Sequence, residues 1–243
     1  MSHTGGDAFA KRLIQHDVRD LFMIPGIQLD WAVDALRRRA DEIRLYVPRH
    51  EQTTTYMADG YYRASGEVGA AMVVPGPGAL NAGAGLATAY ASNSKVLFIT
   101  GQIHSTGVGR GYGLLHEIKD QTGLVRGLTK WNRFVDSPAG IAPAIDQAFR
   151  ELQTGRPRPV GIEIPHDHLS AQAPQSESPP DALAPAAADV DARLLREAAA
   201  LIDQARMPLI YVGGGIFPAQ ASAALKALEI GRASCRERVL VAV

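Results

Sequence analysis

Short runs of apolar residues alternate with longer stretches that mix apolar and polar positions, up to about residue 165. Apolar runs of this length, closed by turn-forming residues such as Pro25-Gly26 or Pro48, are typical of buried strands. The longer stretches have the mixed pattern of helices that pack on a sheet. The expected strands are residues 21–24, 43–47, 70–74, 96–100, 131–135 and 160–164, and the expected helices between them are 51–64, 79–90 and 140–152.

This alternation predicts an α/β fold: an open, mostly parallel sheet of six strands with helices on both faces. Right-handed crossovers would place the loops that follow the strands along one edge of the sheet. Folds of this class bind their ligands at that edge. The loops concerned contain residues 25–27, 49–51, 75–81 and 101–104, so we expect the functional residues to gather there.

The composition changes after the last expected strand, where Pro, Ala, Ser and acidic residues replace the apolar pattern. Beyond this stretch, a helix over 191–205 and a strand over 209–212 that runs into three glycines would open another domain. The tail fits neither domain: it is either foreign to the native sequence or a charged turn before a short strand. The expected divisions are a first domain at 1–168, a linker at 169–190, an incomplete second α/β domain at 191–230 and the tail at 231–243.

The composition is that of an ordinary globular protein, with 46% hydrophobic and 21% charged residues. Its formal net charge is zero, which gives no electrostatic footprint for nucleic acids or membrane surfaces. The N-terminus lacks the apolar segment of a signal peptide, and no apolar run reaches the length of a membrane span. The single cysteine, Cys235, excludes an internal disulfide. We therefore expect a cytoplasmic protein.

The chemically most suggestive residues follow two of the expected strands. Arg49-His50-Glu51-Gln52 opens the helix after the second strand, and Pro75-Gly76-Pro77-Gly78-Ala79-Leu80-Asn81 opens the helix after the third. The whole run, from RHEQTTTYMADGYYRASG to VVPGPGALNAGAGLATAYASNSKVLFITGQI, resembles the N-terminal pyrimidine-binding domain of thiamine-diphosphate enzymes, and among these the acetolactate synthase branch. The resemblance covers about residues 5–230.

The resemblance implies a role for Glu51. In the family, a glutamate at this place hydrogen-bonds a ring nitrogen of the cofactor's aminopyrimidine and favours the imino tautomer, whose nitrogen takes the thiazolium proton. Without these flanking motifs, the same residue would be an idle first-turn carboxylate that only suits the helix dipole. The residues that the resemblance places at the cofactor are Pro25, Gly26, Glu51, Pro75, Gly76, Gly78 and Asn81, with Pro75 where acetolactate synthases commonly have serine.

Four residues are candidates for the substrate side of the site. Ile27 replaces the last glycine of the family's Pro-Gly-Gly turn, so its side chain would project toward the substrate. His104 follows the fourth strand, in the region where some decarboxylating relatives carry two adjacent histidines. His116 and Lys119 belong to a segment that resembles the family loop closing over the substrate from the neighbouring subunit. The alternatives are a plain turn, a structural histidine and a solvated charged loop.

No metal ligands are assigned in this chain. His50-Glu51 lacks the second histidine of a zinc-binding helix, because Thr54 stands at that position. His166-Asp167-His168 is expected to be solvated at the start of the linker. Family members hold the diphosphate and Mg²⁺ through a Gly-Asp-Gly motif in another domain, and this chain has no such motif. The family's second domain binds FAD in some members and nothing in others, and three glycines do not decide between them.

The resulting hypothesis is the N-terminal part of a thiamine-diphosphate-dependent lyase or transferase, a decarboxylase or carboligase acting on 2-keto acids, with Glu51 activating the cofactor. Each family chain offers this glutamate to its neighbour's cofactor, so a homodimer or a dimer of dimers is implied. The chain alone is expected to be inactive without the diphosphate domain. Two alternatives stay open: a non-catalytic α/β module that binds a nucleotide or a partner, and one half of a split thiamine-diphosphate decarboxylase.

Overall fold

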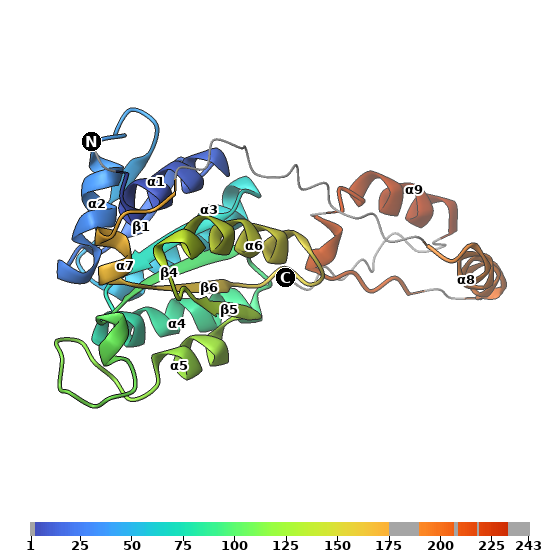
Figure 1. Ribbon diagram of the computed structural model, residues 1–243. Coiled ribbons are helices and arrows are strands. Elements are labelled where there is room, and N and C mark those ends of the chain that lie inside the picture. The colour runs from blue at the N-terminus through green and yellow to red at the C-terminus, as the bar shows by residue number, and fades with distance from the viewer. Residues whose placement is uncertain (1–2, 175–189, 207–208, 218, 233–243) are drawn as a thin grey trace. The chain divides into compact units, whose positions relative to one another are not determined.

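The computed structural model describes residues 3–174, 190–206, 209–217 and 219–232. The chain divides into two compact units, Met1–Pro185 and Ala186–Val243, and each is described by itself (Figure 1).

The first unit is built on one sheet of six parallel strands, in the order β2-β1-β3-β4-β6-β5. The central strands are buried along their whole length, as expected for a parallel sheet covered on both faces. The six-stranded parallel α/β sheet predicted from the sequence is thereby confirmed. The strands are β1 Asp20–Met23, β2 Arg44–Tyr46, β3 Gly69–Val73, β4 Val96–Gln102, β5 Trp131–Phe134 and β6 Val160–Pro165.

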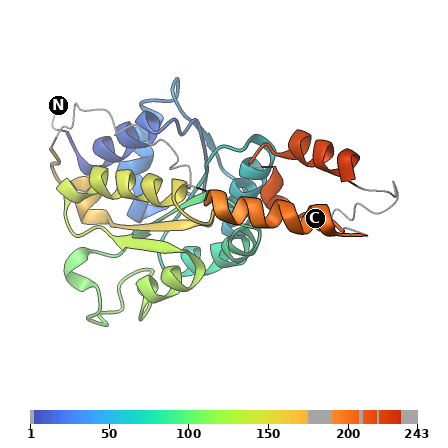
Figure 2. The same ribbon diagram turned by 90° about the vertical axis from the view of Figure 1, so that its right-hand side faces the viewer.

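Helices cover both faces of this sheet, and each face has its own apolar core. In Figure 1, α1 and α6 lie above the strands and α4 and α5 below them; Figure 2 again shows α6 and α5 on opposite sides. One core contains residues of α1 Gly5–Gln15, α2 Asp30–Arg37, α6 Ile141–Gln153 and α7 His166–Ser170, and the other contains residues of α3 Glu51–Ser65, α4 Pro77–Ala91 and α5 Gln121–Leu128.

Four of these helices, α1, α2, α5 and α7, lie where the sequence pattern predicts no element. Their starting signals are short. Thr4 and Asp7 form a reciprocal capping box at the start of α1, and the side chain of Asp120 accepts a hydrogen bond from the Gly123 backbone N–H at the start of α5. Each helix then packs its apolar positions on the sheet, so tertiary contacts complete what the local pattern indicates weakly.

The first unit continues past residue 168, where the linker was expected to begin. The Gly5 N–H donates to the carbonyl of Ala171 at 2.9 Å, and the Ala173 N–H donates to the carbonyl of His3 at 2.9 Å. His168 is buried and its Nδ1 lies 3.1 Å from the carbonyl oxygen of Val135. The expectation of a solvated His166-Asp167-His168 segment was therefore wrong for His168, because α7 packs this stretch against the sheet.

In the second unit, the described residues form α8 Ala192–Gln204, the 3₁₀ turn η4 Gly214–Ile216 and α9 Ser222–Arg232. The helix α8 confirms the one expected over 191–205. The strand expected over 209–212 is not formed among the described residues, which show only a bridge at Val212. An extended segment becomes a strand only when neighbours satisfy its backbone groups. Most of the expected tail, with Cys235, lies outside the described residues.

Candidate functional site

The loops after β1, β3 and β4 meet at one edge of the sheet. Gly101, near the end of β4, marks the meeting point: a Cβ added there would lie 3.1 Å from Pro75 Cδ and 3.3 Å from Gln28 Cβ. This edge carries the carboxyl ends of the parallel strands, where open α/β sheets bind ligands. We call it the rim.

Glu51 is the first residue of α3, directly after the cap residue His50. The Nδ1 of His50 accepts a hydrogen bond from the Gln52 N–H at 3.2 Å, and the positive end of the helix dipole favours a carboxylate at this place. Asn81 Nδ2 donates to Glu51 Oε2 at 3.0 Å. Two of the residues expected at the cofactor from the family resemblance are thus in direct contact, although they lie on different helices. The carboxylate remains partly exposed, and a ligand can reach it.

Close packing of α3 on α4 makes this contact. Thr55 Oγ1 donates to the carbonyl of Ala82 at 2.8 Å across the helix pair. A Cβ added at Gly85 would come within 2.2 Å of the same Thr55 oxygen, so a glycine is needed for this approach. The small residues of α4 therefore fix the spacing between Glu51 and Asn81.

The glycines of the loop after β3 are crowded by protein atoms. Gly76 has a φ of 57°, and a Cβ added there would lie 2.2 Å from the carbonyl oxygen of His116. A Cβ at Gly78 would lie 2.7 Å from Val74 Cγ2. Pro75 is buried. The loop is consequently packed from behind by the chain itself, and only its outer side can meet a ligand.

The loop after β1 is held in a similar way. Pro25 is exposed and Gly26 has an extended backbone, but a Cβ at Gly26 would come within 2.4 Å of Val74 Cγ1. The next residue, Ile27, is 64% exposed. Its side chain projects from the turn, as the sequence predicts for a residue in place of glycine.

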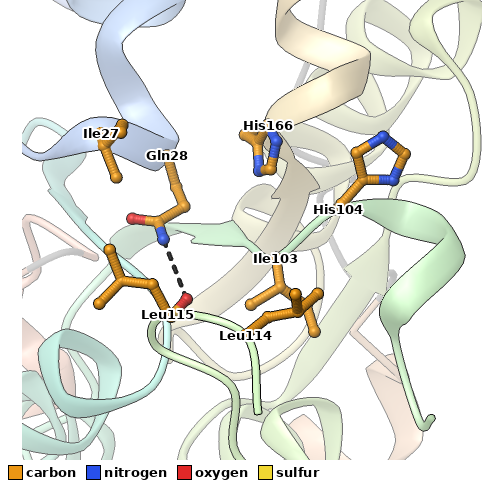
Figure 3. A pocket seen from close by; sticks show the side chains of 7 residues that line it. All are labelled: Ile27, Gln28, Ile103, His104, Leu114, Leu115 and His166. Carbon is orange, nitrogen blue, oxygen red and sulfur yellow. Dashed lines mark hydrogen bonds between the residues drawn. The ribbon is translucent and has the colours of Figure 1, made fainter. Parts of the chain in front are cut away.

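A cavity of about 250 Å³ lies at the rim (Figure 3). It brings together two predicted substrate residues, Ile27 and His104. Its wall is mainly apolar, with one amide and two imidazole side chains as polar groups. The lining residues are Ile27, Gln28, Ile103, His104, Leu114, Leu115 and His166.

Gln28 ties one wall of the cavity to the opposite loop. Its Nε2 donates to the carbonyl of Leu115 at 3.1 Å, drawn as a dashed line in Figure 3, and its Oε1 accepts from His116 Nδ1 at 2.9 Å. His116 therefore contacts the cavity wall from behind rather than lining it. Lys119 is exposed and is not among the lining residues. Gln28 is not among the residues predicted from the sequence, where its only signal is a polar residue directly after the Pro25-Gly26-Ile27 turn.

His104 and His166 form the polar side of the cavity, with their rings edge to face at 5.5 Å between centroids. Asp167 lies next to His104: its Oδ2 lies 3.8 Å from His104 Nδ1 and accepts from Ser105 Oγ at 2.6 Å. Partial burial works to raise the pKa of Asp167, but the hydrogen bonds from Ser105 and the nearby His104 outweigh it and lower that pKa below its usual value. A negative charge thus lies beside the His104 imidazole.

Within the residues that the structure describes, no group of three or more His, Cys, Asp or Glu side chains is arranged to hold a metal ion. None of the helices in these ranges is both long and apolar enough to cross a membrane.

Comparison with known proteins assigns the chain to a protein family. The family described as "Thiamine pyrophosphate enzyme, N-terminal TPP binding domain" matches residues 3–124, half of the chain. The chain therefore belongs to the thiamine pyrophosphate (thiamine diphosphate) enzymes, through their N-terminal cofactor-binding domain. This family assignment confirms the resemblance drawn from the residues around Glu51 and Asn81.

Several proteins of known sequence are similar over nearly the whole chain. A protein of Pseudomonas aeruginosa named "Probable 2-ketoarginine decarboxylase" is 35% identical, over 91% of this chain and 40% of its own length. An acetolactate synthase of Arthrospira platensis is 36% identical, over 93% of this chain and 40% of its own length. The mitochondrial acetolactate synthase catalytic subunit of Saccharomyces cerevisiae is 32% identical, over 88% of this chain and 32% of its own length. The chain thus spans at most 40% of the length of these three relatives.

Proposed function

We propose that this chain supplies the pyrimidine-binding half of the cofactor site in a thiamine-diphosphate-dependent enzyme that decarboxylates or joins 2-keto acids. The observation that carries the proposal is the contact between Glu51 and Asn81 at the rim. Family membership gives the cofactor, and this contact gives a reachable carboxylate whose orientation is fixed. An α/β module that binds a nucleotide without catalysis has no need of such a carboxylate.

The residues at the rim fit the aminopyrimidine part of the cofactor. When bound, the cofactor supplies a carbon nucleophile that forms by loss of a proton. Glu51 would hold a proton on the pyrimidine ring nitrogen, while Asn81 occupies one carboxylate oxygen and leaves the other free to face the ring. The outer side of the loop at Gly76 and Gly78 would lie against the ring, because protein atoms fill its inner side.

A second copy of the chain is proposed to cover this side of α4. The exposed positions of α4 recur at helical spacing, and five of the six are apolar. Leu80 is 53% exposed, and Tyr56 on α3 is 41% exposed. Burying such residues favours association, and it would remove water from around Glu51. The mass in solution by light scattering tests this homodimer. The exposed residues of α4 that carry the proposal are Pro77, Leu80, Asn81, Ala84, Ala87 and Ala91.

The cavity would hold the side chain of the 2-keto acid. The lining residues include no carboxylate, so a cationic side chain such as that of 2-ketoarginine finds no ion-pair partner in this part of the wall. We therefore propose 2-keto acids with apolar side chains as preferred substrates, with His104 near the reacting carboxylate. Comparing kcat/KM for an aliphatic 2-keto acid and for 2-ketoarginine tests the choice; a preference for 2-ketoarginine contradicts it.

Other parts of the site would come from outside this chain. We propose that the diphosphate and its Mg²⁺ are bound by a segment in the larger part of the relatives' length that this chain does not span. A separate subunit supplying that segment is the split-enzyme alternative. Binding of FAD by the second unit and a cytoplasmic location stay predictions.

The test of the proposed function is Glu51→Gln in the complete enzyme, with Glu42→Gln as the matched control. Glu42 is a solvent-exposed carboxylate paired with Arg39, before β2 and at the opposite edge of the sheet. Loss of a group that handles a proton costs about 10²–10⁴-fold in rate, so we expect that loss for Glu51→Gln and none for Glu42→Gln. Wild-type turnover by Glu51→Gln would refute the assigned role.

A further inference from the structure

A carboxyl group is completely buried behind the rim. Glu163 lies in β6 with an exposed fraction of 0%. The other residues of this strand are apolar, and one of them is Gly161. Removing a carboxyl group from water is costly unless hydrogen bonds replace the lost solvation. Glu163 does not line the cavity, so it cannot touch a substrate there. A buried acid in the middle of a core strand needs another physical reason.

Two buried glutamines converge on one oxygen of this carboxyl group. Gln121 Nε2 donates to Glu163 Oε2 at 3.1 Å, and Gln102 Nε2 donates to the same oxygen at 3.4 Å. Gln121 is the first residue of α5, and Gln102 is the last residue of β4. Burial raises the pKa of Glu163, against the hydrogen bond from Gln121, which lowers it. The acceptor oxygen serves both glutamines whether or not the other oxygen carries a proton.

The far end of each glutamine holds a backbone N–H of a rim loop. Gln121 Oε1 accepts from the Gly76 N–H at 2.7 Å, and Gln102 Oε1 accepts from the Ile103 N–H at 2.8 Å. A glutamine amide has an acceptor end and a donor end. Because Glu163 engages the donor end of both, it turns both oxygens toward the loops. Gln121 uses its second N–H on the carbonyl of Gly101 at 3.0 Å, which fixes its amide further.

We propose that Glu163 is a positioning residue that sets the backbone of Gly76 and Ile103 through these two glutamines. Gly76 belongs to the loop proposed to lie against the pyrimidine ring, and Ile103 lines the cavity. One buried carboxyl group thus places the cofactor side and the substrate side of the site relative to each other. The consequence for activity rests on the proposed function, whereas the consequence for the two loops does not.

The first experiment follows hydrogen exchange of backbone amides in this chain. Glu163→Leu removes the acceptor at similar volume and should speed exchange at Gly76 and Ile103 by about tenfold, the scale of one lost buried hydrogen bond. Glu163→Gln keeps an acceptor oxygen and should restore most of the protection. Gln121→Met should affect Gly76 alone, and Gln102→Met should affect Ile103 alone.

Ile162→Ala is the control, because it weakens the same strand without touching the three polar side chains. The proposal is overturned if the Gly76 and Ile103 amides exchange no faster in Glu163→Leu than in Ile162→Ala. The two glutamine variants decide the matter even where Glu163→Leu does not fold: loss of protection at both sites in each of them also overturns it.

The second experiment measures kinetics in the complete enzyme. Glu163→Leu is expected to lose about tenfold in kcat/KM, with recovery in Glu163→Gln and no loss in Ile162→Ala. Unchanged kinetics in Glu163→Leu, with the expected exchange pattern, overturns the link to activity. Failure of the proposed function has a different signature: Glu51→Gln stays fully active while the exchange pattern of Gly76 and Ile103 still holds.

Discussion

Replacing Gly76 by alanine tests how tightly the loop after β3 is built. Gly76 has a φ of 57° and a ψ of −112°, a sparsely populated backbone conformation that costs an L-residue about 1–3 kcal/mol. The new Cβ would also lie 2.2 Å from the carbonyl oxygen of His116. Crowding of this kind adds about 1–3 kcal/mol, and the His116 side chain is held by its bond to Gln28. We expect Gly76→Ala to lower the free energy of unfolding by about 2–6 kcal/mol.

Two other glycines separate the contributions of conformation and crowding. Gly155 has a φ of 61° with no atom within 4 Å of an added Cβ, so Gly155→Ala should show the cost of a positive φ without crowding. Gly127 lies in helix α5 with the same open space, so Gly127→Ala should be neutral or stabilising.

Denaturant titration followed by tryptophan fluorescence is the assay, since both tryptophans, Trp31 and Trp131, belong to the first unit. The expected order of stability is Gly127→Ala, then Gly155→Ala, then Gly76→Ala. Equal stability of Gly76→Ala and Gly155→Ala would show that the crowding by His116 has no energetic consequence.

Two further predictions concern pH. Because the pKa of Glu163 is raised, its contribution to stability is fully present below pH 4.5, the usual value of that pKa, and is lost as pH rises through the folded-state pKa. The wild type should therefore lose stability relative to Glu163→Gln over that pH range in denaturant titrations. A stability difference that does not change with pH contradicts the assignment. The lowered pKa of Asp167 works in the opposite sense: its contribution is present above pH 3.8 and is lost as pH falls through the folded-state value. Ser105→Ala removes the 2.6 Å bond and should make acid unfolding curves shallower, whereas Ser170→Ala, whose hydroxyl contacts only the Asp167 backbone carbonyl, should not.

The strands were predictable because burial on both faces leaves an apolar run in the sequence, as in residues 70–74 and 96–100. At the site, local motifs marked Glu51 and Asn81, which the structure brings into contact, and the role of Glu51 stays a proposal. The cavity was only half predictable. Gln28 acquires its role from Leu115 and His116, which lie 87 and 88 positions away, and no local pattern encodes such a contact.

The sequence carries a signal at Glu163 that the predicted site does not include. The run Val160-Gly161-Ile162-Glu163-Ile164 has the pattern of a buried strand, and a carboxylate inside such a strand is rare unless it is paired. That conflict between pattern and residue was itself a signal of a functional or strained position. The sequence could not show the partner of Glu163. Gln121 begins helix α5, and the polar residues at the start of that helix give no pattern that predicts it.

The two acids at this edge of the sheet illustrate how burial decides what a carboxyl group can do. Glu51 begins a helix and remains partly exposed, so it can exchange a hydrogen bond with a bound ring. Glu163 has no exposed surface, so it can act only on the protein, through side chains that reach the rim. Substituting each acid by glutamine should separate these roles. The change at position 51 removes the group proposed to handle a proton, whereas the change at position 163 keeps the acceptor oxygen on which Gln121 and Gln102 depend.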